Sequence, residues 1–403
     1  MKVVWTTIAH ARAQPGFLGL VGATIALGIA YAFVMPYLSL WASREIGLSS
    51  WQFGAFMTAS GLSAMGLGTA LARWSDVSLS RRTTLAVGAL GGICGYLGYA
   101  WFHHPLILVA IGATCVALSS TCFPQLFAHV RERFAGPGAD PAHGPLSMSL
   151  IRVCFSVAWT LGPAVGGFVV QQAGFHSLFV AAALLYAIFL WGVWRFVPHV
   201  KPQPHAAAVE VPVWRVLLRR DVFGAFTAFM AVFAAHAMNM MNLPLVITEV
   251  LGGSAGDIGL AFGVGPLVEV PLMIWFGHLG ARGHQRALIV WGVAATVLYF
   301  LLLGLATAPW QILPIQILSG VSFAILTNVA ILYFQDLLPG QAGLGTAIFS
   351  NAGNAGNLAG YLAFGLLTEP LGHRGLYGPC LALGVIALAL ILGIKPRTSA
   401  PAP

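Results

Sequence analysis

The chain alternates along its whole length between long apolar stretches and short polar connections. Most stretches reach the roughly 20 residues that an α-helix needs to cross the hydrocarbon core of a bilayer. Backbone groups that face lipid must be hydrogen-bonded within their own segment, so these stretches are predicted to be helices. The expected fold class is therefore all-α and integral to a membrane, with twelve transmembrane helices. Their expected bounds are residues 17–40, 51–72, 83–102, 105–127, 146–170, 175–197, 222–248, 256–279, 287–306, 309–334, 345–367 and 375–394.

The composition is that of a chain solvated mainly by lipid. Of the 403 residues, 58% are hydrophobic and 7% are charged, whereas soluble domains carry about 25% charged residues. All five cysteines fall within apolar stretches. They are expected to be small buried side chains, and neither a disulfide framework nor a metal site.

The basic residues fall in alternate connections. Of the 19 Lys and Arg residues, only Arg44 and Arg374 are expected on the opposite side of the membrane, and Arg152 lies inside a predicted helix. This is the asymmetry of the positive-inside rule, in which Lys and Arg mark the cytoplasmic side. The pattern places both termini in the cytoplasm. It also accounts for the net charge of +8 without a nucleic-acid partner.

The longest connection, 198–221, is rich in Pro, Ala and His and is interpreted as a cytoplasmic linker. It separates an N-terminal six-helix bundle, 1–197, from a C-terminal one, 222–403. A short basic connection recurs at a similar place in each half, at 72–82 and 277–286. The recurrence favours two parallel repeats with pseudo-two-fold symmetry and a binding site between them at the midplane.

The first basic connection holds Asp76, Arg81 and Arg82, and two interpretations of it stay open. Asp76 can cap a helix end or pair with either arginine, which would make the group a topological charge cluster. The recurrence in the second half favours instead an interdomain gating latch. The second connection has no acidic residue near Gly280 and Ala281.

Glu269 stands near the centre of the apolar stretch 256–279. A carboxylate at the bilayer centre costs about 2.5–3.5 kcal/mol on the insertion scale. It can be a structural carboxyl that is hydrogen-bonded to a neighbouring helix. It can also carry a proton or contact a substrate in a transport path, and we expect this second role, with Glu269 as the proton-coupling residue.

Arg152 and Trp159 share one helical face of the stretch 146–170 with Pro163. Arg152 can snorkel to the membrane surface, or point into a cavity and take part in proton coupling. Trp159 can pack against another helix or offer a flat face to a sugar ring. Gly162 and Pro163 thin the helix and remove a backbone donor, which predicts a kink and a close-packing surface used in gating.

Four stretches, 83–102, 175–197, 287–306 and 375–394, carry almost no strongly polar side chain in their interiors. Polar side chains in membranes gather where protein or water is the neighbour, so every third helix is expected to face lipid and the others to surround a wet path. Amides can bond to neighbouring helices, or offer donors and acceptors to a neutral polyhydroxy ligand. His236 is a further candidate for proton relay. The expected substrate contacts are Trp159, Asn239, Asn242, Gln316, Asn351, Asn354 and Asn357.

No motif for catalysis, nucleotide binding or metal binding is found in the sequence. There is no Walker loop and no His, Cys and acid cluster with ligand spacing. The sequence therefore predicts neither an enzyme nor an ATP-driven pump, and no cofactor.

In the order and spacing of its motifs, the chain resembles the sugar efflux transporter family of the major facilitator superfamily. The motifs that carry the resemblance are Pro36–Gly47, Pro124–Ala128, Arg152 with Ala158–Pro163, Asn242–Leu245, Leu267–Pro271 and Tyr333–Asn351. The pattern Gly-Pro-x-x-Gly-Gly that starts at Gly162 is similar to a motif of major facilitator exporters. The resemblance implies the major facilitator fold and proton-linked export of neutral sugars or glycosides, such as lactose or glucose, across a bacterial inner membrane.

The expected function is thus secondary active export of neutral sugars or glycosides by alternating access, in exchange for protons, by a monomer in the inner membrane. A major facilitator drug/proton antiporter for lipophilic compounds is the alternative, because the Gly-Pro motif and the aromatic residues suit it equally. A non-transporting membrane receptor is a third interpretation. It predicts no proton-dependent flux and no dependence on Glu269.

Overall fold

A computed structural model of the protein describes residues 16–135, 144–199 and 216–394. Within these residues the chain forms helices joined by turns, without any β-strand, which confirms the all-α prediction. The chain divides into two compact units, Met1–Ala207 with Ile258–Gly263 and Ala208–Asp257 with Val264–Pro403. Most of the linker predicted at 198–221 lies outside the described residues.

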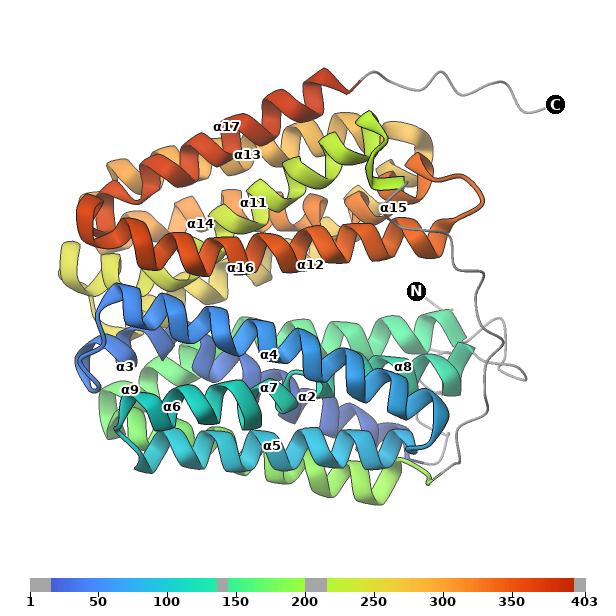
Figure 1. Ribbon diagram of the computed structural model, residues 1–403, viewed down its shortest axis with the longest axis vertical. Helices are drawn as coiled ribbons and strands as arrows, with labels where there is room; N and C mark the ends of the chain where they lie inside the picture. Colours follow the sequence, from blue (N-terminus) through green and yellow to red (C-terminus); the bar gives the residue numbers. More distant parts are fainter. Residues whose placement is uncertain (1–15, 136–143, 200–215, 395–403) are drawn as a thin grey trace. The chain divides into compact units, whose positions relative to one another are not determined.

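The first unit begins with three consecutive helical pieces that form one continuous span. Long helices then follow one another along the chain, joined by short turns (Figure 1). In chain order the elements are α2 (Phe17–Val34), η1 (Met35–Tyr37), α3 (Leu38–Arg44), α4 (Ser50–Val77), α5 (Arg81–Trp101), α6 (Pro105–Ile111), η2 (Gly112–Val116), α7 (Ala117–Ser119), α8 (Cys122–Ala135) and α9 (Gly144–Phe196).

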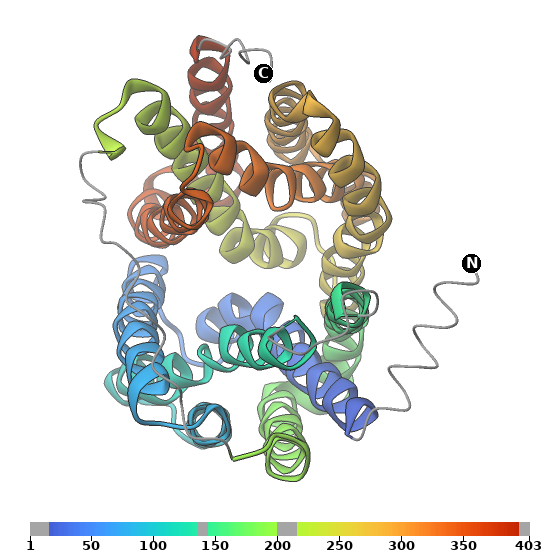
Figure 2. The ribbon, with the colours of Figure 1, turned by 90° about the vertical axis from the view of Figure 1, so that its right-hand side faces the viewer.

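The second unit has the same kind of architecture. Its long helices run alongside one another in Figure 1 and are seen nearly end-on in Figure 2. In chain order the elements are α11 (Arg220–Leu245), η3 (Val246–Val250), α12 (Ala255–Leu279), η4 (Gly280–His284), α13 (Gln285–Leu305), η5 (Pro309–Gln311), α14 (Ile312–Leu326), α15 (Val329–Leu337), α16 (Ala342–Gly375) and α17 (Tyr377–Gly393). Of α12, the segment Ile258–Gly263 is grouped with the first unit.

Among the described residues, eight helices are long and apolar enough to cross a membrane, or nine if the bent pair α16–α17 is one span. Twelve spans were predicted, and the difference has a local cause. Gly174 in α9, Gly283 in η4 and Gly372 in α16 have positive φ and interrupt otherwise continuous helical runs. Glycine adopts this conformation without the steric penalty of a side chain. The runs interrupted at Gly174 and Gly283 each contain two of the predicted helices, and Gly372 lies at the bend between α16 and α17, which correspond to the last two.

The same local backbone motifs recur in both units. α4 and α12 each begin with a capping box, built on Ser49 in one unit and Ser254 in the other. In such a box the side chains of the first and fourth residues satisfy backbone N–H groups that the first turn leaves unpaired. A glycine with positive φ stands two residues before each box, Gly47 with φ 73° and Gly252 with φ 71°. The recurrence favours an internal duplication of a six-helix unit.

The first unit is held together by α2 packed closely on α9. A side-chain carbon placed on Gly162 would lie 2.6 Å from the Cβ of Ala32, so glycine is needed for this approach. Pro163 accepts a 2.6 Å hydrogen bond at its carbonyl from the Tyr37 hydroxyl. Backbone torsions stay helical around Pro163, and the break in α9 is at Gly174. The predicted close-packing surface is present, whereas the gating role stays a prediction.

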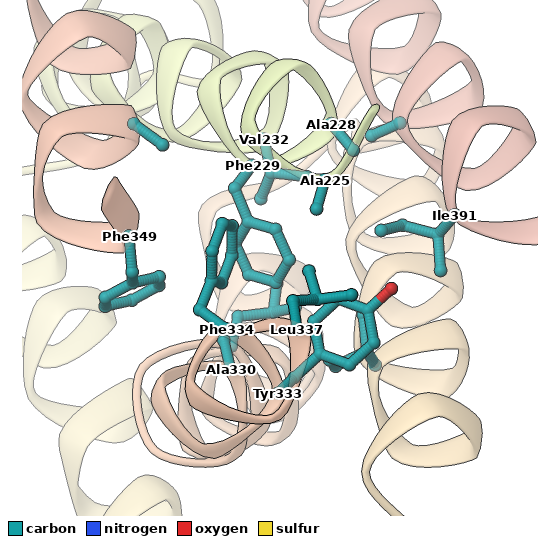
Figure 3. Close-up of a cluster of buried hydrophobic side chains, with 14 of the residues drawn as sticks. Ala225, Ala228, Phe229, Val232, Ala330, Tyr333, Phe334, Leu337, Phe349 and Ile391 are labelled. Atoms are coloured by element: carbon teal, nitrogen blue, oxygen red, sulfur yellow. The ribbon is translucent and has the colours of Figure 1, made fainter. Parts of the chain in front are cut away.

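The second unit has an aromatic core, drawn in Figure 3. Phe229 of α11 meets Phe334 of α15 edge-on, with ring centroids 5.3 Å apart, and Phe349 of α16 at 5.8 Å. Burying one such side chain contributes roughly 1.5–3 kcal/mol relative to exposure. Around these rings small residues such as Ala225 and Ala330 are fully buried and let the helices approach.

Candidate functional site

Arg81, at the start of α5, organises the basic connection of the first unit. Its guanidinium donates two hydrogen bonds to Oε1 of Glu132, at 3.1 and 2.8 Å. It also donates to Ser75 Oγ at 2.8 Å and to Gln125 Oε1 at 2.7 Å, and both of these side chains are buried. The arginine therefore fastens the end of α4 and the start of α5 to α8. The side chain of Asp76 lies outside the described residues.

The second unit repeats these contacts in weaker form. Gln285, at the start of α13, donates to Asp336 Oδ2 at 2.8 Å, and this pair spans 51 residues of sequence, as Arg81 and Glu132 do. Arg82 donates to the carbonyl of Trp194 at 2.7 Å. Arg286 makes the corresponding bond to the carbonyl of Leu392 at 3.1 Å. Where the first unit has an ion pair between Arg81 and Glu132, the second thus has a hydrogen bond from the neutral Gln285 amide to the Asp336 carboxylate.

Glu269 is half-buried on α12 and turned away from the most exposed stripe of this helix. Three of the strongly exposed residues of this helix, Leu260, Leu267 and Ile274, follow one another at seven-residue spacing and form one stripe, with the exposed Trp275 beside its end. Glu269 is two residues from Leu267, which turns it about 200° away from that stripe. Its neighbours at helical spacing on its own face, Gly265 and Phe276, are buried. The carboxyl therefore points toward other helices of its unit.

The hydroxyl of Thr327, at the C-terminal end of α14, lies beside the Glu269 carboxyl. The same hydroxyl donates to the backbone carbonyl of Phe323 at 2.7 Å. A hydroxyl carries a single proton, so it can donate to only one of these groups at a time. When Thr327 donates to Phe323, its oxygen can accept a hydrogen bond from Glu269 only if the carboxyl is protonated.

Asn239 and Gln316 lie close together, as two of the predicted substrate contacts. Asn239 on α11 donates from Nδ2 to the Tyr299 hydroxyl at 3.0 Å, and that hydroxyl is 3.5 Å from Gln316 Oε1 on α14. All three side chains are buried. A side-chain carbon placed on Gly265 of α12 would lie 3.8 Å from Gln316 Oε1. This network therefore begins one helical turn from Glu269.

Asn242 is placed differently from Asn239, although both stand on α11. It is fully buried, and its amide bonds twice to His373: Nδ2 donates to the backbone carbonyl at 2.8 Å, and Oδ1 accepts from the ring Nδ1–H at 2.9 Å. The other ring nitrogen of His373 is 3.5 Å from Glu249. Both polar atoms of Asn242 are therefore occupied by a contact between α11 and the end of α16. Its proposed contact with substrate would require this contact to open.

The three asparagines of α16 present a polar face. Asn351 and Asn354 are exposed and Asn357 is half-buried. The opposite face of the helix carries Gly356 and Gly360, which pack against the backbone of α11. Exposed amides are too costly to face hydrocarbon, so this face requires water or a polar ligand as its neighbour.

Within the first unit, Trp159 of α9 is half-buried. Arg152 lies two turns earlier on the same helix, and its side chain lies outside the described residues.

Sequence reasoning missed Tyr299, Thr327 and His373. Tyrosine and threonine occur at many positions in membrane helices, and no spacing rule links Tyr299 to Asn239, which is 60 residues away. The only usable signal was indirect, because Asn239 and Gln316 on different helices each required a buried polar partner.

Comparisons with known proteins agree on the fold. The family model described as the Major Facilitator Superfamily matches residues 139–282 and 225–403. The chain is 30% identical over 389 residues to the putative sugar efflux transporter of Deinococcus radiodurans, covering 94% of this chain and 98% of that protein. It is 28% identical over 401 residues to sugar efflux transporter A of Escherichia coli K12, covering 98% and 100%. A solved variant of the nucleoside transporter NupG is similar with a TM-score of 0.81 at 14% identity, covering 94% and 99%, which concerns the fold alone.

Proposed function

The chain belongs to the sugar efflux transporters of the major facilitator superfamily, and from this premise we propose that it exports neutral sugars or glycosides in exchange for protons. The chain is a multi-pass membrane protein, and its relatives are transporters and not enzymes. The proposal adds that it works as a monomer by alternating access in a bacterial inner membrane, with both termini in the cytoplasm.

The placement of Glu269 carries the proposal of proton coupling. The carboxyl is half-buried within an apolar helix, and the Thr327 hydroxyl lies beside it. Thr327 can donate to the carboxylate, or it can donate to Phe323 and accept from the protonated acid. One partner therefore serves both protonation states, as a carboxyl that exchanges protons requires.

The sugar site is proposed to lie beside this carboxyl. Gln316 is one helical turn from Glu269 along the contact between α12 and α14, and Tyr299 links it to Asn239. Neutral amides and a hydroxyl suit a neutral polyhydroxy ligand, because they offer donors and acceptors without a fixed charge. The polar face of α16, Asn351 with Asn354 and Asn357, would complete the sugar contacts.

Arg152 and Trp159 supply the proposed contribution of the first unit. Trp159 would stack on the apolar face of the sugar, as aromatic rings do on flat apolar surfaces. Arg152 would compete with the proton for the Glu269 carboxylate. The basic connection between α4 and α5 would be held during gating by Asp76, Arg81 and Arg82. The close contact between α2 and α9 would be maintained by Gly162 and Pro163.

Transport assays in proteoliposomes test the proposal. The wild type and Glu269→Gln are compared for counterflow of labelled lactose or glucose without a pH gradient, and for accumulation driven by a pH gradient. We expect Glu269→Gln to keep counterflow and to lose gradient-driven accumulation. Glu369→Gln, which neutralises an exposed carboxyl on α16, is the matched control and should keep both.

The outcomes separate the two parts of the proposal. If Glu269→Gln keeps gradient-driven accumulation, the assignment of proton coupling is wrong. If the wild type shows no counterflow with any sugar but binds and moves lipophilic cations, the substrate class is wrong.

A further inference from the structure

Three helices of the second unit enclose a small group of polar side chains in an apolar surrounding. His236 and Asn239 stand one turn apart on α11, with 8% and 6% of their surfaces exposed. Tyr299 of α13 is 1% exposed, and its ring lies 6.0 Å from the His236 ring at an angle of 23°. Phe323 of α14 covers the imidazole with its ring centroid 4.5 Å away.

The hydrogen bonds within this group leave two buried polar atoms without a partner. Asn239 donates through Nδ2 to Tyr299, which leaves its carbonyl oxygen Oδ1. That oxygen and Nε2 of His236 are both buried and have no hydrogen-bond partner among the described residues. A buried polar atom without a partner costs about 1–3 kcal/mol, so two of them on neighbouring turns are a substantial cost.

The unit does satisfy other buried polar groups. Thr296 of α13 and Ser322 of α14 are fully buried, and their hydroxyls bond at 2.6 Å. Thr296 also bonds to the carbonyl of Gly292 at 3.1 Å. Arg286 Nε and the Tyr377 hydroxyl of this unit also lack a hydrogen-bond partner among the described residues, but His236 and Asn239 place two unmet atoms on neighbouring turns of one helix.

One chemical group satisfies both unmet atoms at once. Residues three apart on a helix are neighbours, with Cβ atoms about 5–6 Å from each other. A single hydroxyl can donate its proton to Asn239 Oδ1 and accept from His236 Nε2–H. A lipophilic cation has no hydroxyl to offer, and a carboxylate would be repelled by the acceptor oxygen of Asn239.

We propose that His236 and Asn239 form a subsite that binds one hydroxyl of the transported sugar and fixes which hydroxyl the sugar must carry. The proposal rests on the function proposed above and adds a specificity determinant to it. Tyr299 holds the Asn239 amide so that Oδ1 points to the ligand. The subsite is closed in this conformation, so the sugar hydroxyl enters after a side-chain rearrangement within the unit.

Such a subsite should discriminate strongly between sugars. A site built to hydrogen-bond a hydroxyl rejects the analogue that lacks it, because its own buried atoms are then left unpaired. Removal of that one hydroxyl is therefore expected to weaken binding at least tenfold. Removal of any other hydroxyl should have a smaller effect.

The test is a double-mutant cycle between protein and ligand. Glucose and its 2-, 3-, 4- and 6-deoxy analogues are compared as competitors of labelled-glucose counterflow in proteoliposomes. His236→Phe keeps an aromatic ring and removes both nitrogens. We expect it to lower the affinity for glucose tenfold or more, to the level of one deoxy analogue, and to leave the affinity for that analogue unchanged. Thr296→Val is the matched control and should preserve the wild-type order of affinities.

Two further variants keep the test decisive if His236→Phe is poorly folded. Asn239→Leu has a similar shape and should give the same non-additive pattern with the same analogue. Tyr299→Phe removes the hydroxyl behind Asn239, and should weaken this discrimination less than Asn239→Leu does.

The subsite is refuted if these substitutions weaken glucose and all its analogues by the same factor, or weaken none of them. Either result would mean that the two atoms hold a structural water or tolerate being unpaired. A wild type that shows no glucose or lactose counterflow would instead refute the proposed function.

Discussion

Substitution of Gly356 by alanine tests the packing of α16 on α11. A Cβ at this position would lie 2.5 Å from the carbonyl oxygen of Met230 and 2.7 Å from the Cβ of Phe233. Neither atom is the end of a flexible side chain, so the two helices must separate. Overpacking of this kind costs typically 1–3 kcal/mol. Alanine is also a better helix former than glycine by about 1 kcal/mol, which offsets part of the loss.

Gly353 provides the matched control because it stands one turn earlier on the same helix. A Cβ there would lie 3.6 Å from the Phe233 ring, an ordinary contact. Gly353→Ala should therefore gain helix propensity without a clash. Because both variants make this gain, their difference isolates the clash, at about 1–3 kcal/mol.

The assay is thermal unfolding of the purified protein in detergent, followed by tryptophan fluorescence. In a unit of this size, 1 kcal/mol corresponds to about 2–4 °C. We expect Gly356→Ala to unfold several degrees below Gly353→Ala. Equal midpoints for the two variants would refute the close contact between α16 and α11.

Three further predictions concern the polar groups. Arg81→Ala should cost about 1–3 kcal/mol of stability, because it removes the charge-assisted hydrogen bonds that join α4 and α5 to α8. Glu132→Gln, at a carboxyl with 45% of its side-chain surface exposed, should cost less than about 1 kcal/mol. The reverse order in thermal unfolding would be inconsistent with the network. Asn354→Ala should raise the KM for sugar with little change in stability, whereas Asn242→Ala should lower stability by about 1–3 kcal/mol. A loss of stability in Asn354→Ala but not in Asn242→Ala would contradict the assignment of Asn354 to the sugar and of Asn242 to the contact with His373. Thr327→Val should change the pH dependence of sugar export and Thr327→Ser should preserve it, so identical pH profiles for both variants would argue against Thr327 as the partner of Glu269.

Hydrophobic patterning was enough to predict an all-helical membrane fold, because the requirement for backbone hydrogen bonds in lipid leaves few alternatives. It was less informative where the chain turns. The connections at Gly174 and Gly283 are so short that the two helices on either side follow one another without a loop, and at Gly372 the chain bends from α16 into α17. The glycines were visible in the sequence, but a single glycine does not reveal a positive φ.

Individual polar residues were easier to find than their partners. Glu269 stood out because a carboxylate in an apolar stretch is expensive. Its partner Thr327 did not, because a threonine can satisfy itself on its own helix, as this one does with Phe323. Asn242 and Asn239 looked equivalent in the sequence. In the structure, however, Asn242 is hydrogen-bonded to His373, 131 residues away, whereas Oδ1 of Asn239 has no hydrogen-bond partner among the described residues. Such pairings depend on tertiary packing, which periodicity does not encode.

The central claim is that sugar export and proton entry are one coupled process. Coupling is reciprocal, so an outward sugar gradient alone must drive protons inward. Liposomes containing the wild-type protein are loaded with sugar and a pH-sensitive dye, with the membrane potential clamped, and then diluted into sugar-free buffer. The account predicts that the lumen acidifies as sugar leaves, and that Glu269→Gln abolishes the acidification. Sugar efflux from wild-type liposomes with no change in luminal pH, or with alkalinisation, would contradict it.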